Sequence, residues 1–154
     1  MQNPGRFIAL STRDKLLFIH AWLLLAYMRA AILCTSFKKL TRVLQHHREV
    51  PHCRAVVPQQ FEQAVAIGRL VARASRHTPW QSRCLVQVLV VQRLLARRHI
   101  AGQFYLGVFK GGDNGSTELT AHAWVQCGDV IVNGARGHEQ FTIVSTFSWS
   151  GVDD

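Results

Sequence analysis

The periodicity of the sequence changes at Gly102, and this change limits the possible folds more than any other feature. Before it, apolar residues recur at intervals of three and four, which is typical of helices. After it, the side-chain types in residues 103–110 and 117–127 alternate with a period of two, as they do in strands. Gly128-Asp129 then fits a two-residue hairpin turn that leads into a third strand at 130–133. Helices followed by antiparallel strands predict an α+β fold.

The helical part begins with a long apolar helix that ends near Leu33. Residues 49–58 hold two prolines and are typical of a connector. We therefore divide the chain into an N-terminal helical region, 1–58, and a core, 59–154, packed as one compact domain, which suits a chain of 154 residues. The other expected elements are helices at 37–47, 59–75 and 84–98, and a fourth strand at 141–147.

The apolar run in the first helix, residues 16–28, contains 13 residues, whereas a helix needs about 20 to span a bilayer. Arg29 interrupts the run, and no A-x-A cleavage site follows it. The sequence thus favours a helix buried against the domain or a partner, with contact to a membrane surface as the minor alternative. The four cysteines are far apart and form no C-x-x-C pair, which favours a reducing, cytoplasmic location.

Charge is distributed unevenly along the chain. Residues 1–110 hold 17 basic and three acidic residues, a net charge of +14, whereas residues 111–154 hold one basic and six acidic residues, a net charge of −5. The basic part would attract an acidic peptide, a partner protein, nucleic acid or a membrane surface, or it is simply a solvated surface. Charge alone does not choose among these.

Cys84 lies near the start of the helix expected at 84–98, after Thr78 and Ser82, either of which could be the N-cap. A cysteine nucleophile reacts as the thiolate. A helix N-terminus favours that anion, and its free N–H groups can bind an oxyanion. Cys84 is therefore a candidate nucleophile, although a cysteine at such a position is more often a small core residue.

His122 lies in the middle of the expected strand 117–127. Alternation places it on the same face as Thr120, Trp124 and Gln126, opposite a face of small and apolar residues. A histidine on this more polar face could serve as general base. A cysteine-bearing helix packed on a histidine-bearing sheet is the papain-like arrangement.

Three motifs in this order resemble the leader peptidases of lasso peptide biosynthesis, which are standalone transglutaminase-like cysteine proteases. They are Pro79-Trp80-x-x-x-Cys84-Leu85, Phe104-Tyr105-Leu106-Gly107-Val108 and Ala121-His122-Ala123-Trp124-Val125. The resemblance implies a transglutaminase-like, papain-like core with Cys84 as nucleophile and His122 as general base. It also implies three partners: a precursor leader peptide, a separate leader-recognition protein and an ATP-dependent cyclase. No metal or cofactor is expected. Trp80 and Trp124 are expected to contact the substrate.

The resembling family completes its triad with an acid shortly after the histidine strand. This sequence has Asn133-Gly134 there instead. Papain-like enzymes use asparagine in that role, so Asn133 is expected to orient His122. A two-residue turn at Gly128-Asp129 would pair Trp124 with Asn133, which would place Asn133 on the face of His122.

Other interpretations have less support. His46, His47, His52 and Cys53 are metal-ligand types, but their spacing matches no zinc pattern. The glycine-rich 111–115 lacks the Lys-Ser/Thr ending of a phosphate loop. The basic stretch 93–99 lacks interleaved aromatic residues, so no nucleic acid is expected. The sequence thus predicts a peptidase that removes a leader peptide. The alternatives are a non-catalytic binding module and an acyltransferase or amidase on the same scaffold.

Overall fold

The computed structural model describes residues 12–42, 44–47, 57–80, 82–111 and 119–150. Its helices are α2 (Thr12–Cys34), α3 (Phe37–Leu40), α4 (Pro58–Ser75) and α5 (Cys84–Ala96). Its strands are β1 (Gln45–His47), β2 (Gly102–Lys110), β3 (Leu119–Cys127), β4 (Val130–Asn133) and β5 (Thr142–Trp149), with a short 3-10 helix, η1 (His138–Gln140), before β5. The α+β class is confirmed. The glycine-rich loop and the His52-Cys53 pair lie outside the described residues, apart from Gly111.

The strands form one antiparallel sheet in the order β1-β5-β2-β3-β4. The prediction of one helix over residues 37–47 is wrong for the second half of that range. The helix α3 ends at Leu40, and Gln45–His47 pairs with Thr146–Ser148 as an edge strand. Hydrogen bonding to the edge of β5 therefore decides the conformation of this basic stretch, and this contact is 99 or more residues away in sequence.

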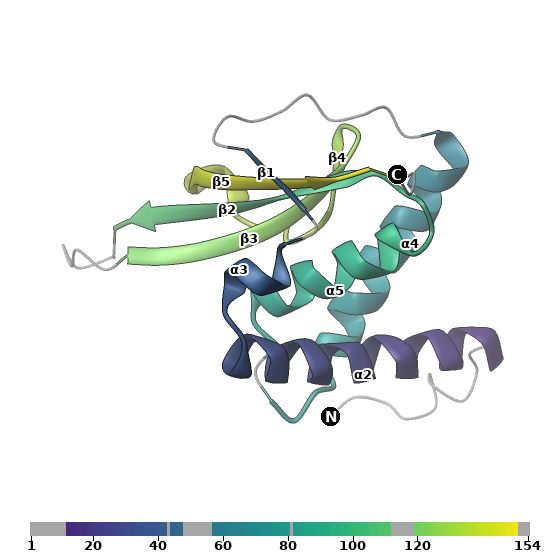
Figure 1. Cartoon of the computed structure of the whole chain (residues 1–154). Helices are drawn as coiled ribbons and strands as arrows, with labels where there is room; N and C mark the ends of the chain where they lie inside the picture. Colours follow the sequence, from purple (N-terminus) through teal and green to yellow (C-terminus); the bar gives the residue numbers. More distant parts are fainter. Residues whose placement is uncertain (1–11, 43, 48–56, 81, 112–118, 151–154) are drawn as a thin grey trace.

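All the long helices lie on one face of the sheet (Figure 1). On that face, strand residues such as Phe104, Ala123 and Val125 join the helices in one hydrophobic core. The opposite face carries Tyr105 and Trp124, whose rings stack with centroids 5.3 Å apart. Alternation along β3 therefore separates a helix-covered face from an aromatic face.

The two strands that carry His122 and Asn133 meet in a register that differs from the expected one. The turn at Gly128-Asp129 is confirmed, and Gln126 pairs with Ile131 as expected. Beyond that pair a β-bulge shifts the register, so that Val125, not Trp124, lies opposite Asn133. One extra residue reverses the face of every later side chain. Asn133 thus faces the helices.

Helix α2 supplies one side of the core through Ala21, Leu25 and Met28, which are buried against α4 and α5. Its opposite side carries an exposed apolar stripe, which we define as Leu16, Ile19, Leu23 and Tyr27, with exposed fractions of 48–63%. The expectation that the apolar run is too short to span a bilayer is wrong, because the helix continues through Arg29. The 20 residues of Lys15–Cys34 are long and apolar enough to cross a membrane. A core helix or a signal sequence passes the same test.

Candidate active site

Cys84 is the first residue of α5, and the expected cap is wrong. The N-cap is Arg83, in extended conformation with ψ of 166°, and no side chain caps the helix. Ser82 lies one residue too early to accept from the first turn. The first backbone N–H groups of the helix have no partner within the helix and point outward at its N-terminal end. The Cys84 side chain, in this first turn, is half-buried.

The segment before Cys84 is held at several points. The Gln87 side chain donates from Nε2 to the carbonyl oxygen of Ser82 at 2.9 Å, which ties the first turn of α5 to the residues before it. The Thr78 hydroxyl lies 2.9 Å from that of Ser82. The Trp80 ring packs on Trp22 of α2 with centroids 4.8 Å apart. Helix α2 therefore positions the entrance to the cysteine-bearing helix.

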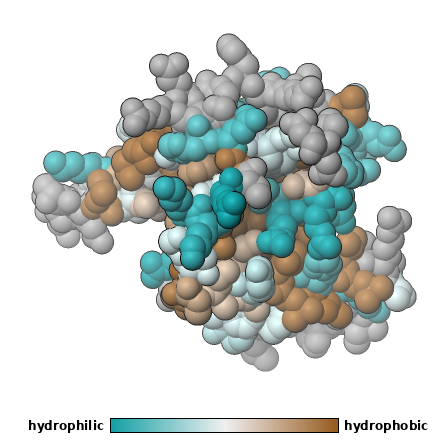
Figure 2. All heavy atoms as spheres, viewed as in Figure 1, coloured by the Kyte–Doolittle hydropathy of each residue, from teal (hydrophilic) through white to brown (hydrophobic). Residues whose placement is uncertain are grey.

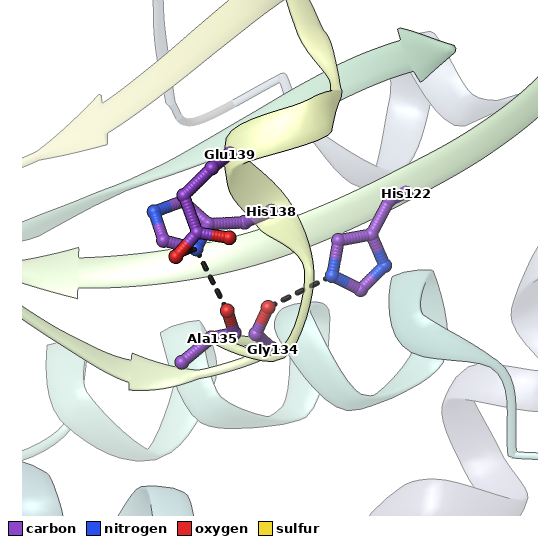
Figure 3. A network of polar contacts seen from close by, with 5 residues as sticks. All are labelled: His122, Gly134, Ala135, His138 and Glu139. Carbon is purple, nitrogen blue, oxygen red and sulfur yellow. Dashed lines mark hydrogen bonds and ion pairs between the residues drawn. The ribbon is translucent and has the colours of Figure 1, made fainter.

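His122 lies on the aromatic face of β3, where its ring packs between two others. The centroid separations are 5.9 Å to Trp124 and 5.1 Å to Phe141. Its Nε2 lies 2.8 Å from the carbonyl oxygen of Gly134 (Figure 3). These contacts fix both the plane and the rotation of the imidazole.

The contact with Gly134 selects a tautomer. A carbonyl oxygen only accepts hydrogen bonds, so Nε2 must carry the proton that is donated to it. In the neutral ring, Nδ1 then keeps its lone pair. The tautomer is inferred from this hydrogen-bond partner. The carbonyl of Gly134 thus leaves Nδ1 as the basic nitrogen of His122.

Gly134 occupies a position that only glycine fits. Its φ is +79°, and a Cβ built on it would lie 2.6 Å from the carbonyl oxygen of Ala123 and 2.9 Å from Cβ of Trp124. The turn that follows is held by His138, whose Nδ1 lies 2.7 Å from the carbonyl oxygen of Ala135 and 3.3 Å from the Glu139 carboxylate (Figure 3). The chain therefore crosses close over β3 and brings a carbonyl to His122.

Asn133, expected to orient His122, lies elsewhere. Because of the bulge, its buried amide faces the helices. Its Nδ2 lies 3.4 Å from the carbonyl oxygen of Gly68 on α4 and 3.5 Å from Oε1 of Gln87 on α5. The amide therefore links β4 to both helices, and the residue after it supplies the acceptor for His122. In the sequence, the only sign of this role of Gly134 is a glycine directly after a strand. Whether its carbonyl oxygen reaches His122 depends on the bulge, which the sequence does not reveal.

The two reactive groups approach from different elements. Helix α5 packs beneath β3, and its N-terminal end points toward the end of the sheet where β2 ends and β3 begins (Figure 1). His122, the fourth residue of β3, lies in that half of the strand. Among the described residues, no hydrogen bond joins Cys84 to His122. The structure thus brings their elements together without a thiol–imidazole contact.

The histidine lies where the edge of β3 is open. Among the described residues, β4 pairs with β3 only as far as Val125, and no other strand continues on that side. Figure 3 shows the His122 ring extending from β3 toward the side of Gly134. The contacts with Gly134, Trp124 and Phe141 hold the imidazole at this open edge.

The two motif tryptophans have different surroundings. Trp124 is 3% exposed and forms the wall behind His122. Trp80 is half-buried against Trp22, and its buried Nε1 has no hydrogen-bond partner among the residues that the structure describes. Substrate contact by either side chain stays a prediction. Elsewhere, Cys34 is exposed and Cys127 is buried.

A family model described as "Transglutaminase-like superfamily" matches residues 31–146. No curated protein and no solved structure matched the chain. The match includes α5, β3 and β4 in full, and with them every residue of the candidate site.

Proposed function

The chain belongs to the transglutaminase-like superfamily, which includes cysteine peptidases and acyltransferases, and from this we propose that it is a cysteine peptidase. We propose further that it removes the leader from the ribosomally made precursor of a lasso peptide. The observation that carries the proposal is the placement of Cys84 as the first residue of α5, beneath the strand whose His122 is held through Nε2. The second support is the motif resemblance around these two residues.

The proposed reaction begins when Nδ1 of His122 takes the proton of the Cys84 thiol. The thiolate attacks the carbonyl carbon of the leader–core bond, and the free N–H groups at the start of α5 stabilise the oxyanion. His122 then gives its proton to the departing amine of the core. The leader remains on Cys84 as a thioester. Water, deprotonated by His122, hydrolyses this thioester and releases the leader as a carboxylate.

The carbonyl of Gly134 does part of what the carboxylate of a triad does. It holds the ring orientation and the tautomer. Because it carries no full negative charge, it stabilises the imidazolium less than a carboxylate would. We therefore propose a dyad, Cys84 and His122, with a backbone acceptor in the third position and without a metal or cofactor. Presentation of the leader by a separate recognition protein, later ring closure by an ATP-dependent cyclase and a cytoplasmic location belong to the same proposal.

Cleavage of a precursor peptide tests the proposal. The purified chain, with and without the recognition protein, is incubated with precursor, and mass spectrometry measures leader and core. Cys84→Ala and His122→Ala should each abolish cleavage while the circular dichroism spectrum is retained, since neither side chain fills a large part of the core. Cleavage by either variant at the wild-type rate contradicts the mechanism.

A non-catalytic binding module is the second candidate, and the absence of a Cys84–His122 hydrogen bond among the described residues favours it. A thiol-reactive probe separates the two. Cys34 is exposed and Cys84 only half-buried, so accessibility alone predicts faster labelling of Cys34. Faster labelling of Cys84 indicates an activated thiol. An acyltransferase is distinguished by adding an amine acceptor, which would then capture the acyl group in preference to water.

A further inference from the structure

A groove of about 690 Å³ lies among α2, α3 and α5, within the range of ligand-binding pockets. It is distinct from the candidate active site. Its α5 wall includes Arg93, which is nine residues after Cys84 in the helix. Nine residues correspond to about 13 Å along the axis and to half a turn around it. A molecule in the groove would therefore leave the thiol accessible.

The groove is cationic. Lys39, Arg93 and Arg97 line it, and no Asp or Glu is among its described lining residues. Within the described ranges, none of these three side chains has an ion-pair partner. Figure 2 shows hydrophilic side chains gathered over α3 and α5. Three cations that face one hollow without a carboxylate repel one another, and an anionic ligand would relieve that repulsion.

The surface is also apolar. Met28, Leu40 and Leu89 line the groove beneath the cations. Tyr27 lines it as well, with the Arg93 guanidinium 5.8 Å from its ring centroid. Tyr27 is also the last member of the exposed apolar stripe of α2, so the stripe runs into the groove. Figure 2 shows this apolar band along α2. Free phosphate would use only the cations, whereas a polypeptide with acidic and apolar side chains would use both.

We propose that this groove docks an acidic, amphipathic polypeptide segment of the protein that presents the precursor. The inference rests on the proposed function, because it assumes that a presenting partner exists. Carboxylates of the segment pair with Lys39, Arg93 and Arg97, and its apolar side chains cover Tyr27 and the stripe. Docking on the side of α5 away from Cys84 lets the partner hold the leader while the scissile bond reaches the thiol.

Fluorescence anisotropy tests the groove without any cleavage. The probe is a fluorescein-labelled peptide in which glutamates and leucines are spaced to form an amphipathic helix, and the protein is the full chain carrying Cys84→Ala. The peptide should bind, and binding should weaken by about tenfold or more in Lys39→Glu/Arg93→Glu, because like charges replace attraction. The milder pair Lys39→Gln/Arg93→Gln should give an intermediate loss. Arg69→Glu/Arg76→Glu, an equal charge change at two exposed positions outside the groove, should bind as wild type does.

Three results would overturn the proposal. The first is equal binding by Lys39→Glu/Arg93→Glu and Arg69→Glu/Arg76→Glu. The second is equal binding of a probe with glutamine in place of glutamate. The third is displacement of the probe by a single-stranded oligonucleotide or by phosphatidylglycerol vesicles that unlabelled peptide cannot displace in turn. The last two results would assign the groove to an apolar, nucleic-acid or lipid ligand. The readouts stay separate from the proposed function. Peptide binding without cleavage of any precursor would support the docking groove and refute the peptidase proposal. Cleavage that depends on Cys84, without peptide binding in the groove, would support the peptidase proposal and refute the docking groove.

Discussion

Replacing Gly134 by alanine tests whether a backbone carbonyl orients His122. At φ of +79°, a residue with a side chain costs about 1–2 kcal/mol. The new Cβ would also lie 2.6 Å from the carbonyl oxygen of Ala123 and 3.0 Å from Cα of Trp124, both backbone atoms that cannot turn aside. Overpacking of this kind costs about 1–3 kcal/mol. The chain at residue 134 must therefore shift, and its carbonyl moves away from Nε2.

A small displacement of a catalytic group lowers rates by up to about a hundredfold. We expect kcat of Gly134→Ala to fall by about tenfold to a hundredfold, with KM nearly unchanged, because the substrate contacts none of the shifted atoms in this account. The assay is precursor cleavage under saturating substrate. A ¹⁵N spectrum of the imidazole should show loss of the tautomer protonated at Nε2.

Gly128→Ala is the matched control. Its φ is +56°, so alanine suffers a similar backbone strain, but no atom lies within 4 Å of the built Cβ. This variant should lose about 1–2 kcal/mol of stability and keep its rate. If Gly134→Ala cleaves as fast as Gly128→Ala, or if both lose activity equally, Gly134 does not position His122.

Three further predictions concern the Asn133 amide, the close approach at Gly68 and the basic charge of the chain. Asn133→Ala should lower the free energy of unfolding by about 1 kcal/mol, through the lost links to Gly68 and Gln87, and leave the ¹⁵N tautomer of His122 unchanged; a changed tautomer would restore Asn133 as the orienting residue. Gly68→Ala should cost about 1–3 kcal/mol in urea unfolding, because its Cβ would lie 1.9 Å from the carbonyl oxygen of Val132; stability equal to wild type would refute this close contact. Partner-stimulated cleavage should weaken as salt is raised, since the Debye length falls to about 3 Å at 1 M; insensitivity to salt would argue against electrostatic assembly.

The sequence predicted those features that depend on local pattern. Alternation located β2 and β3, and the Gly128-Asp129 turn fixed the first pairs of the β3–β4 hairpin. The helix at Cys84 followed from its length and apolar content. These features need only neighbours in the chain, so a single sequence carries them.

The wrong predictions concern features that are determined by contacts between residues outside the local pattern. The bulge next to Val125 is the most consequential, because it turned Asn133 toward α4 and α5 and gave its expected role to Gly134. The edge strand β1 forms only because β5 offers it partners. The N-cap is Arg83, and the hydroxyls of Thr78 and Ser82, the two expected caps, lie 2.9 Å from each other instead. Each depends on packing that no local pattern records.

Detection of the acyl-enzyme shows most directly whether Cys84 is the nucleophile. The wild-type chain is mixed with precursor and presenting partner, quenched with acid within the first turnover, and analysed as intact protein and as peptides. If Cys84 is the nucleophile, the peptide that contains it should gain a mass equal to the leader acyl group, and hydroxylamine should remove this added mass. Release of leader without an adduct in any quench, with cleavage retained in Cys84→Ala, would contradict it.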